Sequence, residues 1–131
     1  MIVNIIKEDF KLAEKDKFAF ESYTTIKNNV LVIIRKDCFS DDTIKYAQYI
    51  LNKYLENKDE VIEYLLKNRL LRAYGQDYTE EYIKNNLNEP QIEIINNEFA
   101  VITWLNHNLD EHIIEVEVYK DFRLADVTLN G

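Results

Sequence analysis

The sequence contains few of the residues that interrupt, cross-link or bend a chain. Its 131 residues include two glycines, one proline and one cysteine. Neither a dinucleotide-binding motif nor a P-loop can be written with Gly75 and Gly131 alone, which excludes glycine-rich phosphate sites. Collagen-like, linker-like and proline-rich classes are excluded for the same reason. A single cysteine, Cys38, permits neither an internal disulfide nor a zinc site of four thiolates.

Long hydrophobic runs are also missing. The apolar stretch near the start covers only Ile2 to Ile6, is interrupted by Asn4 and follows no basic segment. We therefore expect neither a signal peptide nor a membrane span, since a span needs roughly 18 to 20 apolar residues. A cytoplasmic location is expected, and a single free thiol is compatible with a reducing compartment.

Basic residues are scarce, and their scarcity is local. The chain has 24 Asp and Glu against 16 Lys and Arg, a net charge of −8. Residues 1–30 are neutral and residues 31–75 carry +1, whereas residues 76–131 hold twelve acidic and three basic residues, a net charge of −9. An acidic domain repels nucleic-acid backbones and anionic lipid, so we predict no nucleic-acid and no membrane partner.

What is present is ordinary globular composition, with 47% hydrophobic and 31% charged residues. A chain of this length buries roughly two-thirds of the surface that it exposes when unfolded, and so needs no disulfide or metal. We predict a single domain over residues 1–131.

The first part of the sequence predicts a hairpin. The segment Phe18–Ile26 has strand composition, with apolar and small residues alternating on one face. Asn28-Asn29 can adopt the positive φ angles of a tight turn, and the apolar strand Val30–Ile34 follows. Ile2–Ile6 is a further candidate strand, and Lys7–Lys17 is predicted to be a loop or short turn.

The middle of the sequence predicts two or three helices. Ser40 can cap a helix whose first turn holds Asp41 and Asp42. Two apolar stripes at helical spacing follow, separated by the polar segment 57–59, so residues 41–74 form either one bent helix or two. A further short helix is predicted to start at Asp77 or Thr79 and to end at Pro90.

From Gln91 the apolar period changes from that of a helix to that of a strand. Four strands are predicted, around Ile92–Ile94, Phe99–Trp104, Ile113–Tyr119 and Phe122–Leu129. With short turns between them they form a four-stranded antiparallel meander. The predicted fold is therefore α+β: N-terminal hairpin strands, central helices and the meander, in one sheet with the helices on one face.

The meander also predicts an acidic surface. In the strand Ile113–Tyr119 the aliphatic side chains point one way and Glu115 and Glu117 the other, and Glu93 likewise points away from its apolar neighbours. Asp110 and Glu111 precede that strand. This surface is either the wet face of a half-buried sheet or a docking face for a basic protein, with Tyr119 and Trp104 as aromatic anchors.

No catalytic or metal site is predicted. His107 and His112 lie five positions apart rather than four, and no third histidine or cysteine is near. No pair of carboxylates is singled out for glycoside hydrolysis. Cys38 follows an apolar strand, as a small buried residue would. The tyrosines on the predicted helices are more typical of the edge of a core than of a binding site. These are Tyr46, Tyr49, Tyr54 and Tyr64. No cofactor is expected.

The layout resembles a group of small bacterial domains. The segment Leu71-Arg-Ala-Tyr-Gly75 ends the helical part, and Asp110-Glu111-His112 leads into a strand of the meander. In this the chain is similar to immunity proteins of polymorphic-toxin and contact-dependent inhibition systems. The resemblance implies a non-enzymatic protein that binds and neutralises a cognate toxin domain.

Many such toxins are basic nucleases, which an acidic inhibitor would attract. The predicted toxin-binding residues are Glu93, Asp110, Glu111, Glu115, Glu117 and Tyr119. Two alternatives stay open. One is a structural or assembly domain that forms a homodimer, and the other is an enzyme of unrecognised type.

Overall fold

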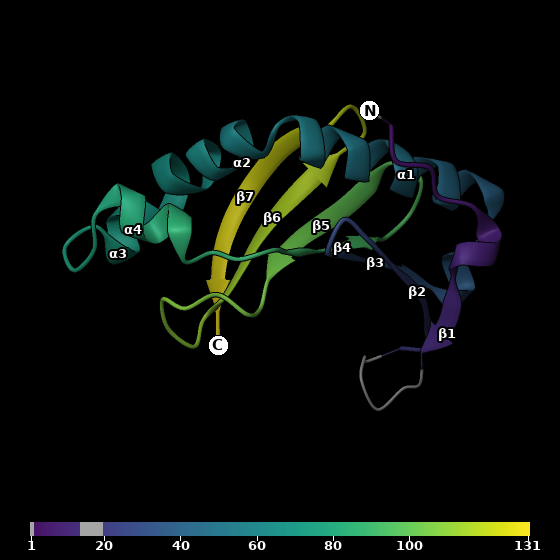
Figure 1. The fold of residues 1–131 in the computed structure, drawn as a ribbon, viewed down its shortest axis with the longest axis horizontal. Coiled ribbons are helices and arrows are strands. Elements are labelled where there is room, and N and C mark those ends of the chain that lie inside the picture. Colours follow the sequence, from purple (N-terminus) through teal and green to yellow (C-terminus); the bar gives the residue numbers. More distant parts are fainter. Residues whose placement is uncertain (1, 14–19) are drawn as a thin grey trace.

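The protein folds as a helical layer packed on one mixed β-sheet. The computed structural model describes residues 2–13 and 20–131 (Figure 1). Its seven-stranded sheet has the order β1-β2-β3-β4-β5-β6-β7, so that strands adjacent in the chain are adjacent in the sheet. The strands are β1 Lys11–Ala13, β2 Ser22–Lys27, β3 Val30–Arg35, β4 Gln91–Ile94, β5 Phe99–Trp104, β6 Ile113–Tyr119 and β7 Arg123–Asn130. The predicted α+β class is confirmed.

The predicted N-terminal hairpin is present as β2 and β3. Asn28 and Asn29 have φ angles of 52° and 66°, as both central residues of a type I′ turn require. The turn pairs Lys27 with Val30. Strand β2 begins at Ser22 rather than Phe18, and residues 18 and 19 of the predicted strand lie outside the described residues.

The N-terminal segment differs from the prediction in two respects. Ile2–Ile6 is not a strand, because its backbone bonds to helix side chains instead of to a neighbouring strand. The amide of Asn52 both accepts from the N–H of Val3 and donates to its carbonyl, each at 2.8 Å, and Gln48 accepts from the N–H of Ile5 at 2.8 Å. A short 3₁₀ turn, Lys7–Asp9, then leads into β1, which lies where a loop was predicted.

The central helices show how residues 41–74 are arranged. Helix α1, Asp41–Glu56, begins at Ser40, whose Oγ accepts from the N–H of Thr43. After a break at Asn57 the chain continues as α2, Lys58–Leu65, a π-helical stretch, Leu66–Leu70, and α3, Leu71–Tyr74. The polar segment 57–59 therefore marks a break after α1.

Helix α4, Glu80–Asn85, is shorter than predicted. It starts at Thr79 and not at Asp77, because the Thr79 hydroxyl accepts from the N–H of Tyr82. Pro90 does not end this helix. The helix ends at Asn85, and Pro90 lies beyond it, next to the start of β4.

The sheet is mixed, a feature that the sequence pattern did not indicate. Strands β4 to β7 form the predicted antiparallel meander. Strand β4 also pairs with β3, in parallel, and this joins the hairpin and the meander. Helices α1 to α4 lie in the crossover between these two strands, which is the connection that a parallel pair requires.

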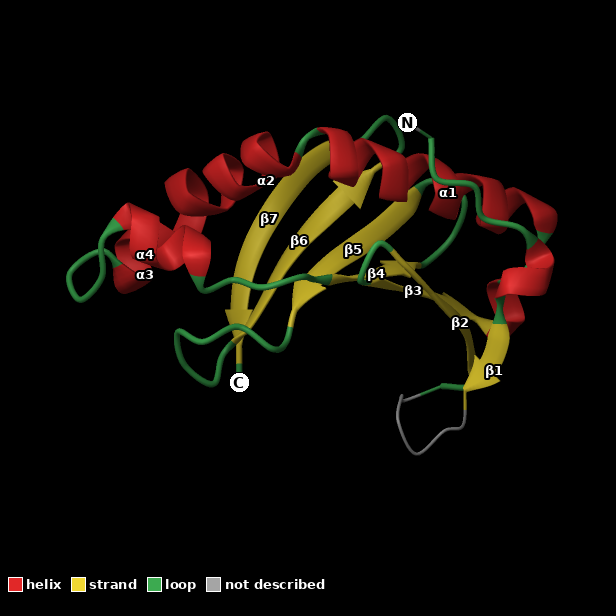
Figure 2. Cartoon of the chain, viewed as in Figure 1, coloured by secondary structure: helices red, strands yellow, loops and turns green. Residues whose placement is uncertain are grey.

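One face of the sheet carries the core. Helices α1 and α2 cross the strands on the same side (Figure 2). Beneath the helical layer, four neighbouring strands each contribute a fully buried side chain: Val32, Ile92, Ile102 and Val116. The helices contribute Ala47, Ile50 and Leu65 to the same core. No helix in the described part of the chain is long and apolar enough to cross a membrane.

Candidate functional site: the uncovered face of the sheet

Within residues 2–13 and 20–131, no helical layer lies on the second face of the sheet, and this face holds most of the predicted site residues. In β6, Ile114, Val116 and Val118 are fully buried against the helices, whereas Glu115 and Glu117 are half-exposed on the opposite side. This confirms the alternation predicted from the sequence. Four of the six predicted residues lie on this uncovered face: Glu93, Glu115, Glu117 and Tyr119.

The register of the strands spaces the carboxylates apart. Glu93 of β4 pairs with Val101 of β5, which in turn pairs with Glu117 of β6. The two glutamates therefore stand two strands apart, about 9 to 10 Å at the usual strand spacing. In the next row Thr103 separates Gln91 from Glu115. The aliphatic and hydroxyl side chains of β5 thus prevent the direct opposition of like charges that weakens a sheet.

Each of the three glutamates on this face already has one partner within the chain. Arg35 donates through Nε to Glu93 at 3.4 Å. Asn130 donates to Glu115 at 2.6 Å, and the Tyr119 hydroxyl donates to Glu117 at 3.0 Å. The bond to Glu117 raises the pKa of Tyr119, because ionisation of the phenol would remove it. Glu93 and Glu117 use one carboxylate oxygen each for these bonds, which leaves the second oxygen of each for another donor.

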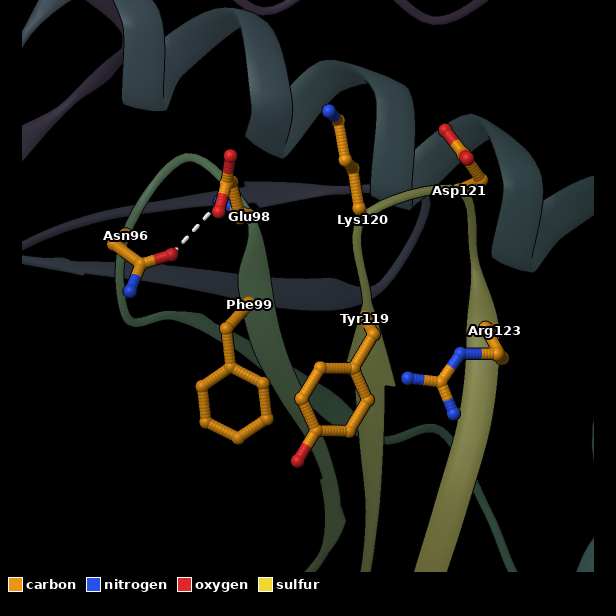
Figure 3. Close-up of a pocket in the computed structure, with 7 residues that line it drawn as sticks. All are labelled: Asn96, Glu98, Phe99, Tyr119, Lys120, Asp121 and Arg123. Atoms are coloured by element: carbon orange, nitrogen blue, oxygen red, sulfur yellow. Dashed lines mark hydrogen bonds between the residues drawn. The ribbon is translucent and has the colours of Figure 1, made fainter.

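An aromatic cluster lies at one end of the uncovered face (Figure 3). The rings of Phe99 and Tyr119 lie 5.0 Å apart, and the guanidinium of Arg123 lies 4.7 Å from the centre of the Tyr119 ring. With the turns beside them they line an open hollow of about 400 Å³. Lys120 and Asp121 line the same hollow but point the other way, toward α1 (Figure 3).

Sequence reasoning missed Phe99 and Arg123. Each of them pairs with Tyr119, one on β5 and the other on β7, so only the strand register reveals the cluster. The predicted strand from Phe122 implies that Phe122 lies opposite Tyr119, but the structure pairs Arg123 with it. The long loop between β5 and β6 gives no local signal for the pairing of Phe99.

Asp110 and Glu111 lie apart from the glutamates, in the loop between β5 and β6. Both carboxylate oxygens of Asp110 have partners there. Its Oδ1 accepts from the Tyr74 hydroxyl at 2.8 Å and from the N–H of His112 at 2.9 Å, and its Oδ2 lies 2.8 Å from the ring of His112. We therefore assign Asp110 to holding this loop against α3. Glu111 is exposed beside it.

The two histidines of this loop serve its structure. His107 is buried, its Nδ1 accepts from the N–H of Leu109, and its Nε2 contacts the carbonyl of His112. An Nδ1 that accepts requires the neutral ring with its proton on Nε2. No group of three metal-binding side chains occurs within residues 2–13 and 20–131. The hydrogen bonds of His107 and Asp110 show that both side chains help to order this polar loop.

The other aromatic candidates lie on the helical side. Trp104 is 1% exposed in the core, so it is not an anchor on the uncovered face. Tyr46 and Tyr54 are buried residues of α1 itself, and burial raises the pKa of Tyr46 to about 12. Cys38 is half-buried, and desolvation raises the pKa of its thiol, the opposite of what a nucleophile needs.

No family model, curated protein or solved structure matches this chain. The uncovered face combines spaced carboxylates, an aromatic pair and arginines, which is a composition suited to binding a protein surface.

Proposed function

We propose that this protein is an immunity or inhibitor-type protein that binds a basic toxin domain through the uncovered face of its sheet. One observation carries the proposal: β4 and β6 present Glu93, Glu115 and Glu117 in adjacent rows of a sheet face that no helix of the described part of the chain covers. Glu111 is exposed in the loop that leads into β6, and Asp110 orders this loop.

A contact between the two segments of the resemblance supports the proposal. The Tyr74 hydroxyl of Leu71-Arg-Ala-Tyr-Gly75 donates to Asp110 of Asp110-Glu111-His112 across 36 positions of sequence. These segments therefore act together as a brace between the helical layer and the loop before β6. A brace of this kind would hold the binding strand rigid, and rigidity lowers the entropic cost of binding.

The charge distribution supports a basic partner. Carboxylates on one face attract a cationic surface at long range, which raises the association rate more than it slows dissociation. Such attraction is screened over about 8 to 10 Å at physiological salt. A complex formed in this way should associate more slowly as salt is added, and it should dissociate at a nearly constant rate.

The proposal predicts that the gene directly upstream encodes a toxin. The test mixes the domain of that toxin with the protein in a stopped-flow instrument, and the absence of such a gene would count against the proposal. We expect binding, neutralisation of the toxin, and association that slows steeply with salt. The double variant Glu115→Lys/Glu117→Lys should associate at least about tenfold more slowly at low salt. The control, Glu80→Lys/Glu81→Lys, makes the same change of charge in the exposed first turn of α4 and should have a much smaller effect.

Two outcomes would contradict the proposal. If the wild-type protein does not bind the toxin domain, the function is wrong. If both double variants slow association equally, net charge alone matters and the uncovered face is not the binding site. Light scattering at micromolar protein concentration is expected to give a monomer, and a stable dimer would favour the assembly alternative.

A further inference from the structure

Two arginines on the uncovered face are each held against an aromatic ring. The guanidinium of Arg35 lies 4.3 Å from the ring centre of Phe20, and that of Arg123 lies 4.7 Å from the ring centre of Tyr119. Both occupy the same end of the face, Arg35 as the last residue of β3 and Arg123 as the first residue of β7. Stacking of this kind fixes the plane of a guanidinium and leaves its N–H groups directed outward.

The two arginines differ in whether a carboxylate of the chain pairs with them. Arg35 is paired, since its Nε donates to Glu93 at 3.4 Å. Arg123 has no carboxylate within 4.0 Å in residues 2–13 and 20–131. Glu117 stands beside the same tyrosine, but it accepts from the Tyr119 hydroxyl instead. The hydroxyl thus engages the neighbouring carboxylate of Glu117, which forms no ion pair with Arg123.

The surroundings of Arg123 form a place for a second group. The guanidinium opens onto the hollow of about 400 Å³, and the rings of Phe99 and Tyr119 form an apolar wall beside it. Arginine binds carboxylates through two parallel N–H bonds, and it is enriched with aromatic residues among those that dominate binding energy. An aromatic wall beside an oriented, unpaired guanidinium fits an acidic side chain with an apolar neighbour.

We infer that Arg123 receives an Asp or Glu side chain of the toxin domain, while an apolar side chain next to that acid packs on Phe99 and Tyr119. This inference rests on the proposed function and adds a second chemistry to it. The glutamates attract the basic surface of the partner, and Arg123 selects one acidic residue within that surface. The glutamates thus set the rate of association, and Arg123 sets the lifetime of the complex.

The experiment measures dissociation of the complex with the same upstream-encoded toxin domain. Arg123→Gln should dissociate at least about tenfold faster than wild type, because it leaves the acid of the partner buried without a charge to pair with. Arg123→Lys should fall between the two, since an ammonium keeps the charge but loses the planar fork. Arg69→Gln, which removes the same charge from the exposed surface of the helical layer, is the control and should leave dissociation unchanged.

A second variant tests the role of the Tyr119 hydroxyl. Tyr119→Phe keeps the ring beneath Arg123 but releases Glu117, which can then pair with Arg123 and compete with the acid of the partner. We expect the complex of Tyr119→Phe to dissociate faster than that of wild type. The double variant Tyr119→Phe/Arg123→Gln should dissociate little faster than Arg123→Gln alone, because the effects of two substitutions on one contact are not additive.

In the last step each Asp of the toxin domain is replaced in turn by Asn, and each Glu by Gln. For one of these replacements, a double-mutant cycle with Arg123→Gln should show that the two effects on dissociation are not additive. The inference is overturned if no acid couples, or if Arg123→Gln and Arg69→Gln dissociate alike while wild type binds normally. Absence of wild-type binding is a different result, because it overturns the proposed function and this inference with it.

Discussion

The two faces of one sheet contrast sharply, residue by residue. Val116 and Glu117 are neighbours in β6, yet Val116 is fully buried against the helical layer while Glu117 is half-exposed on the other side. Ile102 and Val101 make the same contrast in β5. The covered face is mostly aliphatic, whereas the uncovered face mixes carboxylates, hydroxyls, aromatic rings and arginines with some aliphatic residues, among them the buried Ile33. Alternate residues of the same strands thus belong to the core and to the proposed binding face.

The largest expected effect comes from placing a charge on the covered face. Val116→Asp buries a carboxylate without a partner, and it should lower the free energy of unfolding by about 3 to 5 kcal/mol or leave the protein unfolded. Glu117→Gln, one residue away, should change it by less than about 0.5 kcal/mol. Urea unfolding followed by circular dichroism measures both. Equal shifts of the two midpoints would show that the faces are not distinct.

Removal of apolar volume should also destabilise the covered face more than the uncovered face, but by a smaller difference in the free energy of unfolding. Ile102→Ala leaves a cavity beneath the helices and should cost about 2 to 5 kcal/mol. Val101→Ala removes a half-exposed side chain, and it should cost less than about 1 kcal/mol because part of that surface is already in water. The same urea experiment decides. A cost at Val101 as large as at Ile102 would indicate that something covers the second face in the free protein.

The helical cover itself can be weakened at its start. Ser40→Ala removes the oxygen that accepts from the N–H of Thr43 and should cost about 1 kcal/mol. Ser40→Asn supplies another capping oxygen and should retain most of the stability. Thermal unfolding is sensitive enough to separate the two variants. If they are destabilised equally, the hydroxyl is needed for something other than capping.

The smallest expected effect is the pH dependence of the brace at Asp110. Partial burial acts to raise the pKa of Asp110, but the bonds from His112 and Tyr74 outweigh it and hold the pKa below its usual value. A lowered pKa in the folded state stabilises above the unfolded value of about 3.9 and loses this stabilisation as pH falls. Asp110→Asn should be less stable than wild type by under about 1 kcal/mol near neutral pH. The difference should shrink below about pH 4, and a constant difference down to pH 2 would contradict it.

Local patterns in the sequence predicted the elements whose hydrogen bonds are local. The alternation in Ile113–Tyr119, the turn at Asn28-Asn29 and the cap at Ser40 each depend on residues close together in the chain, and all three are confirmed. The carboxylates of β4 and β6 were placed on the correct face for the same reason, since alternation alone fixes the side to which a strand residue points.

Features that depend on distant partners were not predictable. Ile2–Ile6 has strand composition, but its backbone bonds to the side chains of Gln48 and Asn52 more than 40 positions away. The parallel pairing of β3 with β4 has no local signal, because neither strand encodes its neighbour. The contact of Arg35 with Glu93 follows from that pairing, so the partial neutralisation of the acidic face was missed as well.

The order of the strands has a consequence for the way in which the chain folds. Every antiparallel pairing in the sheet joins strands that follow one another along the chain. Only the pairing of β3 with β4 closes a long loop, as Leu31 meets Gln91 sixty positions later. Loop closure is slow and entropically costly, so this one step should limit the folding rate. Truncation of the side chain of Val32 or Ile92 to that of alanine should therefore slow refolding. The same truncation at Leu124 of β7 should mainly speed unfolding.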